Sequence, residues 1–97
     1  MTESARKEFI ANMKRRLDDL DANIDELEKK ADKVEADARK EYEQRLADMK
    51  EKRRQVDQKL DEIRAAGESG WDSLKQEAEH TWKALQNSFN YFTSHYK

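Results

Sequence analysis

The chain has 97 residues, of which 43% are charged and only 35% hydrophobic, so a compact globular core is disfavoured. Twenty basic residues nearly balance twenty-two acidic ones, and the net charge of −2 supplies no strong attraction to nucleic acid. Cysteine and proline are absent and strong helix formers dominate, which excludes disulfides and thiolate metal sites and favours helices that each bury a narrow stripe. We therefore expect an all-α protein.

The N-terminal two thirds of the chain carry an apolar stripe with helical spacing. From Ile10 onward, apolar side chains recur at alternating steps of three and four, which is the heptad repeat of a coiled coil. Steps of four at Tyr42 and Leu46 form a stutter, after which the repeat resumes with Arg53 as a charged interruption. The pattern predicts one helix over residues 5–65, about 90 Å long at 1.5 Å per residue.

A second amphipathic stripe occupies the C-terminal part of the chain and contains most of its aromatic residues. Its steps of three and four predict another helix over roughly residues 70–95. The chain thus divides into a long charged coiled-coil helix (1–66), a glycine-containing turn (67–70) and an aromatic-rich amphipathic helix (71–97).

The segment between the two stripes predicts a helical hairpin. Gly67 suits the residue that follows a helix C-terminus, and Ser69 with Asp72 resembles a capping box for the next helix. The alternative is a continuous helix, because the apolar phase also runs through Gly67 and Gly70, at a cost of about 2 kcal/mol relative to alanine.

The lengths of the two helices predict self-association. A second helix of about 26 residues can cover only residues 40–66 of the first. Leaving the earlier large apolar side chains in water, at roughly 1.5 kcal/mol each, would forfeit about 10 kcal/mol. We therefore expect a homo-oligomeric bundle of open stoichiometry. In a parallel dimer, Arg16 would face Asp21 of the second copy and Lys30 would face Glu35, which slightly favours that orientation.

Two sets of residues follow from this arrangement. The expected oligomer interface comprises Ile10, Met13, Leu17, Leu20, Ile24, Leu27 and Val34. The expected core of the hairpin or bundle comprises Tyr42, Leu46, Met49, Val56, Leu60, Ile63, Trp71, Leu74, Trp82, Leu85, Phe89 and Phe92.

Groups that could carry chemistry are sparse. Glu77 and His80 have the Glu-x-x-His spacing of metal sites in bundles, but such sites need a second motif, and Phe92 stands three residues before His95. The serines have no histidine and aspartate arranged for nucleophilic catalysis. Acidic neighbours dilute the basic run at 50–54. We expect no enzyme activity, no metal, no cofactor and no nucleic-acid partner.

The aromatic helix leaves one alternative open. Its rings suit either a bundle core or a lipid interface, but its polar face lacks the excess of lysine and arginine that is typical of interfacial helices. A bundle core is the favoured interpretation, and peripheral membrane binding is the alternative. No apolar run approaches the roughly 18 residues of a membrane span, and no apolar signal segment precedes the stripe, so we expect a cytoplasmic protein.

Two tryptophan units give the chain a family resemblance. Trp71-Asp-Ser-Leu-Lys and Trp82-Lys-Ala-Leu follow a glycine-bearing break and a long charged helix that contains Tyr42 and Leu46. In these features the chain resembles small bacterial coiled-coil proteins described as stress-response proteins, although its C-terminus is more aromatic and polar. The resemblance implies a bacterial, non-enzymatic protein linked to stress. The leading hypothesis is a homo-oligomeric scaffold or interaction protein, whose partners are itself and a further helical protein.

Overall fold

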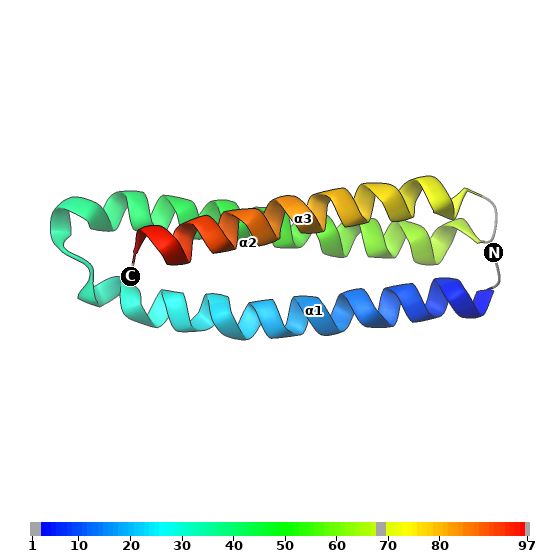
Figure 1. Ribbon diagram of the computed structural model, residues 1–97, viewed down its shortest axis with the longest axis horizontal. Helices are drawn as coiled ribbons and strands as arrows, with labels where there is room; N and C mark the ends of the chain where they lie inside the picture. Colours follow the sequence, from blue (N-terminus) through cyan, green and yellow to red (C-terminus); the bar gives the residue numbers. More distant parts are fainter. Residues whose placement is uncertain (1–2, 68–69, 97) are drawn as a thin grey trace.

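The chain folds into three helices that lie side by side along one axis. The structure is a computed structural model that describes residues 3–67 and 70–96. Helix α1 spans Glu3–Lys30, a short 3-10 turn (η1) spans Ala31–Lys33, α2 spans Ala36–Ala66 and α3 spans Trp71–His95. Figure 1 shows α2 running back along α1, and α3 running back along α2. The rod measures 51 × 19 × 18 Å. The predicted all-α class is confirmed.

The predicted hairpin between α2 and α3 is also confirmed. The two helices are the most closely packed pair in the molecule. Gly67 and Gly70 have φ angles of 75° and 90°, a backbone region that glycine adopts without steric cost. The chain therefore reverses at this turn, and the alternative of a continuous helix is wrong. Ser69, which we paired with Asp72 in a capping box, lies outside the described residues.

The prediction of one unbroken helix over residues 5–65 is wrong. Helix α1 ends at Lys30, and a short connection separates it from α2. Val34 (φ −78°, ψ 139°) and Glu35 (φ −57°, ψ 146°) are extended there, and the Glu35 side chain makes no capping hydrogen bond at the start of α2. Neither glycine nor proline occurs in this connection. The residues of this connection therefore allow the helix to end here, but none of them requires it to end.

Side chains from α2 hold the connection in place. Arg39 donates from Nη2 to the carbonyl oxygens of Asp32 and Val34, both at 3.1 Å. The Tyr42 hydroxyl donates to the carbonyl oxygen of Leu27 at 2.6 Å, which satisfies a carbonyl in the last turn of α1. The bonds from Arg39 replace the backbone bonds that the carbonyls of Asp32 and Val34 would accept in a continuous helix.

Because the chain reverses at this connection, the apolar face of α1 is covered by α2 and α3. Its Ile10, Met13, Leu17, Leu20 and Ile24 are all buried within the single chain, with exposed fractions between 1% and 8%. The premise that this ridge is too long for the chain to cover is therefore wrong, because the break lets α2 and α3 lie against it. Burying these side chains supplies the free energy that favours the break over a longer helix.

Candidate interaction surface

Helix α1 packs on a surface formed by the faces of α2 and α3 that are turned toward it. Two members of the expected oligomer interface, Leu27 and Val34, are only half-buried, whereas the other five are buried against the chain's own helices. The expected core residues divide in the same way. Leu74, Trp82 and Phe89 are half-buried and pack against the core, and the buried members are Tyr42, Leu46, Met49, Val56, Leu60, Ile63, Trp71, Leu85 and Phe92.

Three ion pairs fix α1 on α2. Lys14 lies 3.3 Å from Asp57, and Lys50 pairs with Glu28. Between them, Arg53 makes a forked contact with Asp21, with Nε and Nη2 each 2.9 Å from a carboxylate oxygen. These three pairs all reach α2 rather than α3. They lie along the edge of the apolar interface and set the register of the two helices.

Arg53 explains the charged interruption in the apolar stripe. Its side chain is half-buried, and its hydrogen bonds to Asp21 are the main cause of the raised pKa of the guanidinium. The guanidinium therefore remains charged and uses its forked geometry to bind one carboxylate. No charged side chain is buried among the described residues, so Arg53 lies at the border of the core. The sequence alone did not reveal Asp21 as the partner of Arg53, because we expected both residues to lie far apart in one straight helix.

Apart from the exposed Tyr91, the aromatic side chains of α3 and the adjoining Tyr96 pack against the other two helices. Phe92 packs 4.7 Å from the ring of Tyr42 on α2, and Tyr96 lies 5.0 Å from the same ring. At the opposite end, Trp71 packs 6.1 Å from Phe9 of α1. These clusters stand at the two ends of the bundle. They anchor α3 to α2 at one end and to α1 at the other.

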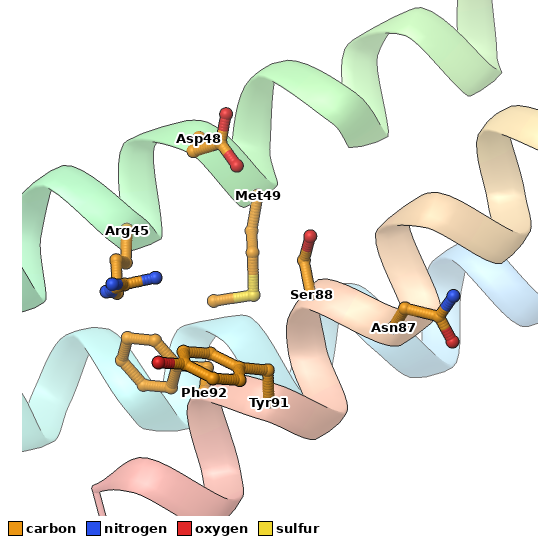
Figure 2. Close-up of a pocket in the computed structure, with 7 residues that line it drawn as sticks. All are labelled: Arg45, Asp48, Met49, Asn87, Ser88, Tyr91 and Phe92. Carbon is orange, nitrogen blue, oxygen red and sulfur yellow. The ribbon is translucent and has the colours of Figure 1, made fainter.

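A small pocket lies between α2 and α3 near the aromatic end. Figure 2 shows Met49 extending from α2 toward α3, with Arg45 also on α2 and Tyr91 and Phe92 on α3. Met49 and Phe92 are buried, whereas Tyr91 is exposed. The Arg45 guanidinium lies 5.1 Å from the centre of the Tyr91 ring and also pairs with Glu41. The pocket holds about 230 Å³. Ser88 lines it without a histidine among the lining residues, so the pocket assembles no nucleophile and base.

A groove separates α1 from α3. Leu20 of α1 and Trp82 and Phe89 of α3 line it, together with polar side chains of both helices, and its volume is about 250 Å³. The half-buried Trp82 and Phe89 lie at this border. Helix α1 is thus closely paired with α2 along one edge and leaves a groove along the other.

The described residues form neither a metal site nor a membrane span. No cluster of three or more histidine, cysteine, aspartate or glutamate side chains within residues 3–67 and 70–96 is arranged to hold a metal ion. No helix in that part of the chain is both long and apolar enough to cross a membrane. Glu77, which we considered beside His80 as a metal ligand, instead lies 3.5 Å from Lys59 of α2.

The sequence and the fold were also compared with known proteins. No family model, no curated protein and no solved structure matches the chain.

Tyr42 provides a test of the link between α1 and α2. Burial and the nearby Tyr96 raise the pKa of the Tyr42 hydroxyl, which is hydrogen-bonded to the Leu27 carbonyl oxygen. Tyr42→Phe should lower the free energy of unfolding by about 1 kcal/mol at neutral pH, as measured by urea denaturation. Tyr91→Phe, at an exposed tyrosine, is the control and should change little.

The same hydroxyl predicts a dependence on alkaline pH. Because the pKa in the folded state lies above the unfolded value of about 10, the folded chain keeps the proton that the unfolded chain loses. The stabilisation is complete below pH 10 and is lost as the pH rises through the raised pKa. The advantage of the wild-type chain over Tyr42→Phe should therefore shrink above pH 10. An advantage that stays constant over this range would contradict a buried, neutral hydroxyl.

Proposed function

We propose that this chain is a non-enzymatic interaction protein whose α2–α3 hairpin is a docking surface for an amphipathic helix. In the folded chain, α1 occupies that surface. The proposal rests on two features of the packing of α1. Its apolar stripe is buried, with Met13 and Leu17 each 1% exposed. Half-exposed ion pairs with α2 lie beside that stripe. Helix-in-groove recognition uses the same combination, with apolar anchors for affinity and edge charges for register.

The covalent connection to α1 is not required for any of these contacts. A helix with the same stripe and edge charges makes the same contacts when it belongs to another molecule. Because α1 is tethered by a short connection, it competes at high effective concentration, and a partner binds only when α1 is displaced. Conditions that loosen α1 would then expose the docking surface, which suits the stress-linked role that the resemblance implies.

The placement of the aromatic residues favours this function over membrane binding. Interfacial binding requires aromatic rings that face outward. Trp71 and Phe92 are each 1% exposed, and Trp82 lies half-buried at the groove between α1 and α3. Tyr91 is the large hydrophobic side chain that the described chain exposes most, at 53%, and it is covered on one side by Arg45. The aromatic residues of α3 support packing between helices.

Complementation by a separate helix tests the proposal. In the full chain with Leu17→Asp, α1 should be displaced because a carboxylate replaces a buried side chain. A synthetic peptide of residues 3–30 should then bind in the vacated place and raise the melting temperature as its concentration increases, since a ligand specific for the folded state stabilises it. Calorimetric titration measures the same binding directly.

The matched control is the same peptide with Leu17→Asp, which should neither bind nor raise the melting temperature. If Leu17→Asp unfolds the whole chain, the milder Leu17→Ala serves as the host. A folded host in which hydrogen exchange shows α1 to be detached, and which still does not bind the native peptide, would overturn the proposed docking surface.

A further inference from the structure

The connection between α1 and α2 has the backbone conformation expected of a hinge. It contains no residue that forbids a helix, and every described residue with positive φ is a glycine outside it. Lys30 already has helical angles, and η1 is a helical turn. Only Val34 and Glu35 have the extended ψ angles that separate α1 from α2. Rotation of these two residues to helical ψ would join the helices into one.

The apolar stripe passes through this hinge without losing phase. Leu27, Ala31, Val34 and Ala38 follow one another at steps of four, three and four. In the folded chain these four side chains are only half-buried. Leu27 and Val34 line a groove of about 530 Å³ together with Tyr42 and Tyr96. If the hinge straightened, this stripe would lie on one face of a continuous helix, where a second copy of the chain could cover it.

We infer that two copies of this chain exchange α1: the hinge straightens, and the α1 helix of each copy docks on the α2–α3 hairpin of the other. This inference rests on the proposed docking surface and names its occupant. The straightened helix over residues 3–66 would be about 95 Å long at 1.5 Å per residue. Two such helices lie antiparallel about a two-fold axis at the hinge, which gives a closed dimer with two identical docking sites.

Exchange preserves the interactions that hold α1 in the single chain. The pairs of Asp21 with Arg53 and of Lys14 with Asp57 re-form between the copies, because α1 still runs antiparallel to α2. The hydrogen bonds from Arg39 to the hinge carbonyls are given up for backbone bonds of the continuous helix. The apolar side chains of the hinge meet their counterparts at the two-fold axis. The equilibrium between one and two copies therefore depends on concentration and on the hinge.

Charge exchange between two variants tests this directly. One chain carries Asp21→Arg and the other Arg53→Asp, so each alone places like charges between its own α1 and α2. In an exchanged heterodimer, the arginine introduced into the first chain meets the aspartate introduced into the second at one docking site. At the other docking site, the native Asp21 of the second chain meets the native Arg53 of the first. Both sites of the heterodimer therefore hold an attractive pair.

After the two variants are unfolded and refolded together, we expect roughly tenfold more dimer than either forms alone, since two repulsive pairs become attractive. Native mass spectrometry identifies the heterodimer. A side-by-side dimer of closed chains keeps its repulsive pairs, so an unchanged dimer content in the mixture would overturn the inference. The chain with both substitutions is the control: it re-forms an attractive pair between positions 21 and 53, so its dimer content should return toward that of the wild type, although the contact of Arg53 with Asp57 is lost.

Proline at the start of α2 isolates the hinge. Ala36 is the first residue of α2, where proline is well tolerated, and Glu35 before it has the extended angles that a following proline favours. In a straightened helix the same proline would lie in the interior and break it. Ala36→Pro should therefore abolish the dimer while the monomer melts at or above the wild-type temperature. Ala36→Ser, which leaves φ free, is the control and should retain the dimer.

The outcomes separate this inference from the proposed function. A wild-type chain that sediments as a monomer at every concentration, or an Ala36→Pro chain that dimerises like the wild type, overturns the exchange of α1. The docking surface then still stands if the peptide of residues 3–30 binds to the Leu17→Asp chain.

Discussion

Leu17→Asp is expected to detach α1 from the rest of the molecule. Leu17 is 1% exposed and lies in the middle of the buried stripe of α1, so the substitution removes a packed side chain and puts a carboxylate in its place. The lost packing alone is worth about 2–5 kcal/mol, and desolvation of the carboxylate adds to it. Such a loss is comparable to the whole stability of a small domain. Circular dichroism should show a clear loss of helix at 25 °C, and the urea midpoint should fall sharply.

The matched control for this variant is Ala11→Asp. Ala11 lies on the same helix but is exposed, and basic side chains outnumber acidic ones three and four residues away, so the new carboxylate enters water and costs little more than the difference in helix propensity, about 0.5 kcal/mol. Hydrogen exchange followed by mass spectrometry should show faster exchange in α1 for Leu17→Asp and not for Ala11→Asp. Equal effects at both positions would contradict the assignment of the packed face.

The turn between α2 and α3 could be read from the residues themselves. Gly67 and Gly70 both have positive φ angles in the structure, and a side chain at either position would be strained. A requirement for positive φ can be recognised in the sequence, because glycine adopts such angles at the lowest cost. The helical hairpin was therefore predictable, and so was the helical content on either side of it.

The turn between α1 and α2 could not be recognised from any residue type in the sequence. The hinge residues have ordinary negative φ angles, and the apolar phase continues through Ala31 and Val34 as it would in a longer helix. The break is decided by tertiary packing, because folding α1 onto α2 and α3 buries Ile10 and Met13 without a second molecule. The cost of leaving the ridge exposed was predictable from its residues, but the ability of the helix to bend and cover that ridge was not.

One signal for the antiparallel arrangement was nevertheless present in the charges. Lys14 and Asp21 stand seven residues apart on the border of the α1 stripe, and Asp57 and Arg53 carry the opposite charges in the reverse chain order on α2. Opposite charges that match in reverse order are what an antiparallel pair of helices requires. The parallel pairs considered from the sequence compared the N-terminal segment only with itself, so this match was missed.

Trp71→Ala is expected to loosen the end of the bundle where the two glycines lie. Trp71 is the first residue of α3, is 1% exposed, and packs against Phe9 of α1 with the Lys75 ammonium 5.8 Å from its ring centre. Truncation of a buried aromatic side chain of this size should lower the free energy of unfolding by about 3–5 kcal/mol. Thermal and urea denaturation followed by circular dichroism measure the loss.

Two comparisons make the result specific to this contact. Trp82→Ala removes an indole of the same size from a half-buried position beside the groove between α1 and α3, so its cost should be smaller, about 1–2 kcal/mol. Trp71→Phe should recover most of the stability, because the indole N–H of Trp71 has no hydrogen-bond partner within the described residues and its loss leaves no acceptor unpaired. Because Phe9 of α1 packs against the Trp71 ring, Trp71→Ala should also weaken the packing of α1 on the α2–α3 hairpin. Trp71→Ala should therefore speed hydrogen exchange in the first turns of α1, far along the chain from the substitution, whereas Trp82→Ala should leave those turns protected.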